Sequence, residues 1–252
     1  MEGQPAEGGA PDERPTPALR TEAEGAAVGA RQAPAAPPEL SRYPVAVAPG
    51  LELTISSDPS NAWGYCVGNS LWSSAEPLLE YLSRPAVRSA LAGSRILELG
   101  AGLGAVGMGA ALLGAAEVVL TDVEQMQRLL IHNIDTNFTH KGPDGPRVRA
   151  AVLDWAQPLP ADCAPPWDFI LASDVAYKPD LYEPLWDTLA GVASAGTRVI
   201  MALPAREEDE ETTLGAFFSL AAGRFTQEVV AKKQPEPHQS VVHVFELRRT
   251  AV

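Results

Sequence analysis

The chain has 252 residues, which suits one domain with an appendage at roughly 100–200 residues per domain. Hydrophobic residues make up 46% and charged residues 20%, which excludes a fully disordered chain, and no apolar run is long enough for a membrane span. The formal net charge of −13 argues against binding nucleic acid or anionic lipid through bulk charge and favours a basic partner.

The first 40 residues differ in composition from the rest of the chain. Ala, Gly and Pro fill more than half of these positions, and no residue among them is aromatic. Such a segment cannot bury enough apolar area to offset its chain entropy. We therefore predict a disordered tail over residues 1–40 and a folded domain over residues 41–252.

The domain begins with a predicted β-hairpin. Apolar residues alternate from Val45 to Ile55 on either side of a Pro-Gly turn. A glycine-spaced loop follows over Trp63–Asn69. Apolar residues at helical spacing then predict a helix over Leu71–Leu82 and a second, short helix over Pro85–Leu91.

After residue 94 the pattern alternates between strand and helix. This alternation predicts an α/β fold with a mostly parallel sheet and helices on both faces, because each crossover helix must bury its apolar side against the sheet. The predicted parallel strands are Arg95–Leu99, Glu117–Thr121, Val148–Leu153, Phe169–Ser173 and Arg198–Leu203. The predicted helices are Gly104–Leu113, Glu124–Asn137, Leu181–Val192 and Thr212–Ala222, and the closing antiparallel pair is Phe225–Val230 and Val241–Leu247.

The most informative segment joins the first of these strands to the helix after it. Four glycines lie between Leu99 and Met108. Glycine lets the backbone turn tightly and lets a ligand lie against bare amides. Asp122 ends the next strand, where a carboxylate can accept hydrogen bonds from both hydroxyls of a ribose. The segment therefore predicts a nucleoside-containing cofactor.

The charge of Glu98 separates two candidate cofactors. The spacing Gly102-x-Gly104-x-x-Gly107 also fits the dinucleotide fingerprint, which is weak evidence by itself. Glu98 would repel the pyrophosphate of NAD but attract the cationic methionyl part of S-adenosylmethionine. We therefore expect S-adenosylmethionine. Glu98 could instead pair with a neighbouring base, and Asp122 could cap the following helix.

Several motifs occur in the order found in class I, seven-strand methyltransferases. They are Leu97-Glu-Leu-Gly-Ala-Gly-Leu-Gly104, Thr121-Asp122, Leu153-Asp-Trp155 and Asp174-Val-Ala-Tyr177. With Gly68-x-x-x-Trp72-x-x-Ala75 and Val241-Val-His-Val-Phe245, residues 43–249 more closely resemble the family-16 protein lysine methyltransferases, the METTL21-like group. The resemblance implies a Rossmann-like seven-stranded sheet of order 3-2-1-4-5-7-6, with strand seven antiparallel.

The resemblance also implies residue roles. Asp174 and Tyr177 would face the substrate amine as catalytic residues. In S-adenosyl-L-methionine, the methionyl part would lie along Glu98, Gly100 and Gly102, with Trp72 at its end. Asp122 would bind the ribose, and Trp155 with Asp154 would lie by the adenine. Ser173 would also bind the cofactor. The residue chemistry agrees, because an indole can stack on adenine and open α/β sheets bind ligands at their carboxyl edge.

Each of these side chains also has a purely structural alternative. Trp72, Trp155 and Tyr177 could be packing aromatics, and Asp174 could be a helix N-cap. No metal site is expected, because the two cysteines and four histidines lack metal-ligand spacing.

Other functions are less consistent with the sequence. An NAD(P)-dependent oxidoreductase is disfavoured by Glu98 and by the lack of a Tyr-x-x-x-Lys pair. The intact glycine loop argues against an inactive adaptor or chaperone-like module. A small-molecule or RNA methyltransferase is disfavoured by the lack of an Asn-Pro-Pro-Tyr-type motif and by the acidic charge. We expect a protein substrate with a basic surface, a monomer without nucleic-acid or membrane partners, and a cytoplasmic or nuclear location.

Five consecutive acidic residues, Glu207–Glu211, follow the fifth parallel strand. They could only keep a loop solvated, or they could form a negative lip that attracts a basic protein. A lysine arrives charged because its pKa is about 10.4, and burial beside a cationic sulfonium would lower that pKa. We expect Asp174 to hold the ammonium, and no histidine is placed as a general base.

Overall fold

The structure is a computed structural model that describes residues 39–63, 66–139, 142, 145–205 and 210–250. The predicted tail, residues 1–40, therefore lies almost wholly outside the described residues, and its boundary stays a prediction. The side chains of the acidic run Glu207–Glu211 also lie outside them. Within the described ranges, no helix is both long and apolar enough to cross a membrane.

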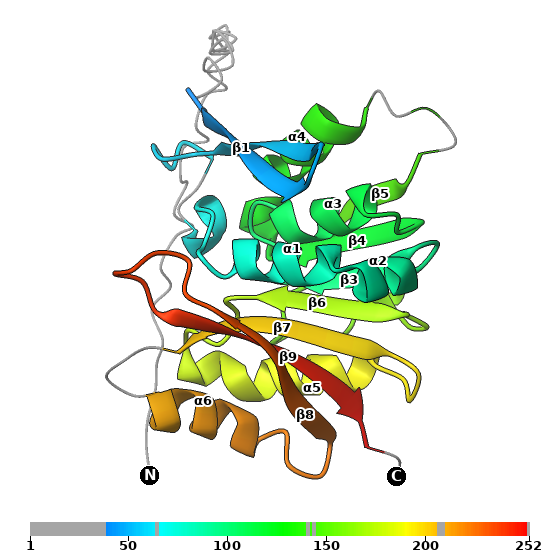
Figure 1. The fold of residues 1–252 in the computed structure, drawn as a ribbon, viewed down its shortest axis with the longest axis vertical. Coiled ribbons are helices and arrows are strands. Elements are labelled where there is room, and N and C mark those ends of the chain that lie inside the picture. The colour runs from blue at the N-terminus through cyan, green and yellow to red at the C-terminus, as the bar shows by residue number, and fades with distance from the viewer. Residues whose placement is uncertain (1–38, 64–65, 140–141, 143–144, 206–209, 251–252) are drawn as a thin grey trace, which may run out of the picture. The chain divides into compact units, whose positions relative to one another are not determined.

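Seven strands form the central sheet in the order β5-β4-β3-β6-β7-β9-β8 (Figure 1). Neighbouring strands from β5 to β7 run parallel, and β9 is antiparallel to both β7 and β8. Counted from β3, this is the predicted order 3-2-1-4-5-7-6, so the predicted fold class is confirmed. The strands are β3 (Arg95–Leu99), β4 (Glu117–Asp122), β5 (Arg147–Val152), β6 (Phe169–Ser173), β7 (Arg198–Ala205), β8 (Phe225–Lys233) and β9 (Val241–Arg249).

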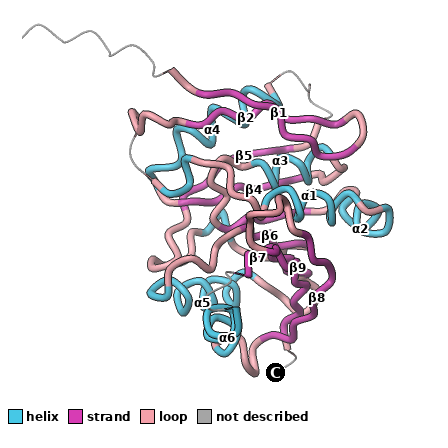
Figure 2. The backbone as a smooth tube through the Cα atoms, turned by 60° about the vertical axis from the view of Figure 1, so that its left-hand side comes forward, coloured by secondary structure: helices cyan, strands magenta, loops and turns pink. Residues whose placement is uncertain are grey.

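Helices cover both faces of the sheet (Figure 2). Side chains alternate along each strand, so Ile96 packs with α1 to α4 on one face and Leu97 packs with α5 and α6 on the other. The helices are α1 (Ala75–Ser83), α2 (Pro85–Leu91), α3 (Ala105–Leu112), α4 (Gln127–Phe138), α5 (Tyr182–Val192) and α6 (Glu210–Ser219). The carboxyl ends of the parallel strands therefore meet at one edge between the two helical layers.

The predicted hairpin is a separate two-stranded sheet of β1 (Ser41–Ala48) and β2 (Leu51–Ser57). Gly50 turns the chain at a φ of 77°, which glycine adopts at no steric cost. The inward residues of both strands, including Leu53 and Ile55, belong to the same apolar cluster as α1, α3 and α4. The hairpin thus extends the helical layer on that face.

The first predicted helix before the parallel strands begins later than expected. The helix expected from Leu71 starts at Ala75 as α1, so Trp72 lies in the loop before it. The Trp72 indole Nε1 donates a hydrogen bond to the Val67 carbonyl oxygen at 2.9 Å. This bond ties residues 67–72 into a local turn, which apolar spacing alone does not reveal.

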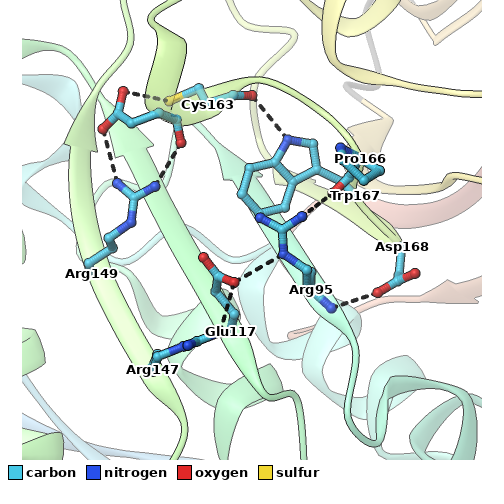
Figure 3. Close-up of polar contacts among 9 residues, drawn as sticks. Arg95, Glu117, Arg147, Arg149, Cys163, Pro166, Trp167 and Asp168 are labelled. Atoms are coloured by element: carbon cyan, nitrogen blue, oxygen red, sulfur yellow. Dashed lines mark hydrogen bonds and ion pairs between the residues drawn. The ribbon is translucent and has the colours of Figure 1, made fainter.

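Charged residues join the amino ends of the central strands (Figure 3). Arg95 Nε donates to Glu117 Oε2 at 3.0 Å, and Arg147 Nη2 donates to the same oxygen at 3.2 Å. The backbone N–H of Arg95 donates to Asp168 Oδ2 at 2.8 Å. The hydrogen bond from Arg95 lowers the pKa of Glu117. This network fixes the edge of the sheet opposite the carboxyl ends.

Candidate active site

A pocket of about 300 Å³ lies at the carboxyl ends of the central strands. Its size is at the lower end of the range for small-molecule sites. All ten residues predicted to form the site line this one pocket: Trp72, Glu98, Gly100, Gly102, Asp122, Asp154, Trp155, Ser173, Asp174 and Tyr177. The fold therefore brings together groups that are up to about a hundred residues apart in the chain.

The glycine loop between β3 and α3 forms one wall of the pocket. Gly100, Gly102 and Gly104 have φ values of 63°, 53° and 81°, which side-chain-bearing residues rarely adopt. A Cβ on Gly100 would lie 3.1 Å from the Trp155 ring and 3.0 Å from a Val175 methyl. The conformation of the loop and its close packing therefore require glycine, and Gly100 and Gly102 line the pocket with backbone alone.

The loop before α1 lies against the glycine loop. A Cβ on Gly102 would lie 3.2 Å from the Gly68 carbonyl oxygen, so the two backbones are in close contact. Gly68 itself lines the pocket, as do its neighbours Cys66 and Val67. In the sequence Gly68 stands out only as part of the Gly68-x-x-x-Trp72 motif, and its being a glycine is the one local sign of this backbone contact.

Glu98 is buried, with 2% of its surface exposed, below the first turn of α3. Its Oε2 accepts the Gly107 backbone N–H at 2.9 Å. Burial, together with the nearby charge of Asp122, raises the pKa of Glu98 to about 8 against the opposing effect of the Gly107 hydrogen bond. The expectation of a carboxylate paired with a neighbouring base is not met, because this hydrogen bond comes from a backbone amide.

Asp122 at the end of β4 holds the glycine loop. Its Oδ2 accepts the Gly102 N–H at 2.8 Å, and its Oδ1 accepts the Val123 N–H at 2.8 Å. Burial raises the pKa of Asp122, and these two hydrogen bonds lower it. The alternative that Asp122 caps the next helix is wrong, because Val123 occupies the N-cap position and makes no side-chain cap.

Asp154 and Trp155 follow β5 and differ in what their side chains do. Asp154 Oδ1 accepts the Ala156 N–H at 3.0 Å, which closes a local turn. The Trp155 ring packs against Gly100 at the floor of the pocket and is half-buried. Trp155 therefore has a face available for a flat ligand, whereas the Asp154 carboxylate serves the turn that presents it.

Asp174 follows β6 and has a left-handed backbone, with φ at 58°. Asp and Asn are the side-chain-bearing residues that best tolerate this region, which is enriched at functional sites. Its Oδ2 accepts a hydrogen bond from Ser74 Oγ at 3.2 Å. Ser74 is the N-cap residue of α1, yet its hydroxyl makes no cap. The Asp174 carboxylate is thus oriented by a buried serine that no motif in the sequence marks as a site residue.

Ser173 and Tyr177, the predicted site residues that flank Asp174 in the sequence, differ in exposure. Ser173 Oγ is buried and has no hydrogen-bond partner among the described residues. Tyr177 is 40% exposed at the mouth of the pocket. Burial is the largest cause of its raised pKa, followed by the charge of Asp122. Ser173 itself lines the pocket, and a buried hydroxyl without a partner is uncommon in a folded protein.

The mouth of the pocket is apolar and uncharged on one side. Val67, Leu71, Trp72 and Tyr177 all line the pocket, and each is at least 36% exposed. Aliphatic and aromatic side chains at the mouth suit the hydrocarbon stem of a lysine better than a phosphate or a nucleotide.

A family model described as "Lysine methyltransferase" matches residues 49–221, which is more than half of the chain. The chain therefore belongs to the lysine methyltransferase family. The predicted family and enzyme class are confirmed, and the oxidoreductase alternative is wrong. Three named protein-lysine methyltransferases are similar to it in sequence.

This lysine methyltransferase is 32% identical to protein N-lysine methyltransferase METTL21A of Mus musculus over 71% of the chain and 76% of that protein. It is 34% identical to METTL21A of Danio rerio over 57% of the chain and 64% of that protein. It is 31% identical to EEF1A lysine methyltransferase 3 of Xenopus tropicalis over 57% of the chain and 61% of that protein. The alignments with the last two relatives therefore span less than two thirds of their length.

Solved structures show the same fold for this lysine methyltransferase. Magnesium protoporphyrin IX methyltransferase from Synechocystis PCC 6803 with bound SAH matches with a TM-score of 0.52 and 14% identity, over 71% of the chain and 84% of that chain. The same protein with bound SAM matches with a TM-score of 0.51 and 16% identity, over 71% of the chain and 80% of that chain. These matches confirm the Rossmann-like methyltransferase fold.

Proposed function

We propose that this chain transfers a methyl group from S-adenosylmethionine to the ε-amine of a lysine on a protein substrate. The observation that carries the proposal is the single pocket that joins the glycine loop, Asp122 and Asp174. The family to which the chain belongs and the names of its relatives support a lysine on a protein as the acceptor.

The residues of the pocket fit this cofactor. Gly100 and Gly102 line the pocket with backbone alone, and the Trp155 ring lies beside Gly100. Asp122 retains carboxylate lone pairs for ribose hydroxyls. Ser173 lines the same pocket. The cofactor would supply an electrophilic methyl group on a cationic sulfur.

The chain's own residues would hold and align the lysine. Asp174 would attract the ammonium and keep the amine at the pocket mouth, and Trp72 and Tyr177 would enclose the apolar stem. Enclosure removes water and lowers the pKa of the amine, which favours the neutral nucleophile. Alignment and water exclusion would then supply most of the rate.

A basic surface on the protein substrate is the further part of this proposal. The net charge of −13 supports it, since opposite charge speeds encounter. The acidic run Glu207–Glu211, which follows β7 in the sequence, is the proposed source of that attraction. The monomeric state and the cytoplasmic or nuclear location stay predictions.

Calorimetry and labelling test the function together. We expect S-adenosylhomocysteine to bind in the micromolar range and NAD neither to bind nor to compete. Incubation of the protein with a proteome lysate and methyl-labelled S-adenosylmethionine should label discrete protein bands. Binding without any labelled band would favour the inactive adaptor, and binding of NAD alone would refute the cofactor assignment.

Glu98 should make cofactor binding depend on pH. Because burial raises its pKa to about 8, the empty pocket holds mostly protonated Glu98 at pH 7. A cationic methionyl group beside it favours the carboxylate, so binding should release a proton below pH 8. Affinity for S-adenosylmethionine should therefore rise between about pH 6 and 8 and level off above. Calorimetry at pH 7 in two buffers with different ionisation enthalpies measures the proton release.

Glu98→Gln is the matched control for this pH dependence, because it keeps the shape but cannot titrate. It should bind more weakly, with no proton release from this site. The unliganded wild type should also lose stability as the pH rises from about 4.3, the unfolded pKa of a glutamate, through about 8, because ionised Glu98 is buried. Identical pH profiles of affinity in both proteins would contradict the assignment.

A further inference from the structure

Two asparagines of α4 bind the free edge of β2. Asn133 Oδ1 accepts the Ser56 N–H at 2.8 Å, and Asn133 Nδ2 donates to the Ser56 carbonyl oxygen at 3.0 Å. Asn137 makes the same pair of bonds with Thr54, both at 2.9 Å. The side-chain amides thus replace the backbone of a neighbouring strand.

The spacing of residues along the helix and along the strand explains why both asparagines reach β2. Residues four apart in a helix rise by about 6 Å, and residues two apart in a strand advance by about 7 Å. Asn133 and Asn137 on one helix face therefore meet the alternate residues Thr54 and Ser56. The pairing also covers an edge of the hairpin that would otherwise expose unpaired backbone groups.

Asn133 has one further contact that Asn137 lacks. Its Nδ2 donates to the Leu103 carbonyl oxygen at 3.1 Å, whereas Asn137 Nδ2 donates to the Asn133 carbonyl oxygen within α4 at 2.8 Å. Leu103 lies between Gly102 and Gly104 in the glycine loop and lines the pocket. Asn133 is completely buried and Leu103 is 2% exposed, so water cannot readily replace this hydrogen bond.

The chain that leaves β2 also returns to the same loop. After Ser57 it runs through the loop before α1, where Gly68 lies against Gly102. The glycine loop is therefore held by Asp122 at the Gly102 N–H, by Asn133 at the Leu103 carbonyl, and by the Gly68 backbone.

We propose that Asn133 is a positioning residue for the cofactor, because it fixes the Leu103 carbonyl and couples the β1–β2 hairpin to the glycine loop. It does not line the pocket, so it acts through the loop that would lie against the cofactor. The inference rests on the proposed function. It assigns to the hairpin a role in cofactor affinity as well as in packing.

Asn133→Ala and Asn137→Ala form a matched pair, since both lose a hydrogen-bonded pair to β2. Calorimetry with S-adenosylhomocysteine on the full chain should show a dissociation constant at least about ten-fold higher for Asn133→Ala and within about two-fold of the wild type for Asn137→Ala. Thermal melts would establish that both variants are folded at the measuring temperature. Equal affinities in the two folded variants would overturn the inference.

A measurement on the wild type does not depend on the folding of a variant. Residue-resolved hydrogen exchange would compare the Ser56 amide, bound by Asn133, with the Thr54 amide, bound by Asn137. Added S-adenosylhomocysteine should slow exchange of the glycine-loop amides and of Ser56 at least about three-fold more than that of Thr54. Protection of the glycine loop with equal effects on Ser56 and Thr54 would overturn the inference. A wild type that does not bind S-adenosylhomocysteine would instead refute the proposed function.

Discussion

Asp174→Asn is expected to reduce methyl transfer by about 100-fold or more while leaving the dissociation constant of S-adenosylhomocysteine within about two-fold. Asparagine tolerates the left-handed backbone at this position nearly as well as aspartate, so the substitution removes the charge with little added strain. Its amide keeps one oxygen to accept the Ser74 hydroxyl. The loss would therefore report the missing attraction for the lysine ammonium.

The measurement is incorporation of labelled methyl groups into proteome proteins, with calorimetry on the same samples. Asp174→Ala is a second variant, in which an alanine at φ 58° adds roughly 1–2 kcal/mol of backbone strain. It should lose activity like Asp174→Asn and also melt at a lower temperature. Full labelling by Asp174→Asn would remove Asp174 from the substrate site.

Asp122→Ala is expected to weaken S-adenosylhomocysteine binding by about 1–3 kcal/mol, or roughly 5- to 150-fold. The Asp122 carboxylate has one role that the structure shows and one that we propose. It accepts the Gly102 and Val123 amides, and it is the proposed acceptor for the ribose hydroxyls. Alanine leaves both amides without their acceptor and removes the ribose contact, so calorimetry should show the loss directly.

Asp154→Ala is the matched control for this effect. Asp154 is also a pocket-lining carboxylate after a strand, but its Oδ1 accepts the Ala156 N–H of its own turn. We expect its dissociation constant to change by less than about three-fold, since local turn bonds contribute modestly. A larger loss in Asp154→Ala than in Asp122→Ala would show that the carboxylate roles are reversed.

The sequence determined the order of elements because each carries a local signal. Strands such as Arg95–Leu99 and Phe169–Ser173 are short apolar runs between turns, and their predicted bounds match the structure. The glycine loop is equally local, since its left-handed residues require glycine. The site could be predicted because strands of a parallel sheet end at one edge, which brings Asp122 and Asp174 together without any knowledge of contacts.

Tertiary structure alone decided what the site's side chains bind and how they ionise. Glu98 looked like a charged group at a strand end, but α3 covers it, and only burial raises its pKa to about 8. Ser74 falls within the helix predicted from Leu71, yet its hydroxyl meets Asp174, a hundred residues away. Asn133 likewise stood out only as one residue of the predicted helix Glu124–Asn137. Its three partners on β2 and the glycine loop are set by how α4 packs, because hydrogen bonds between distant segments leave no periodicity in the sequence.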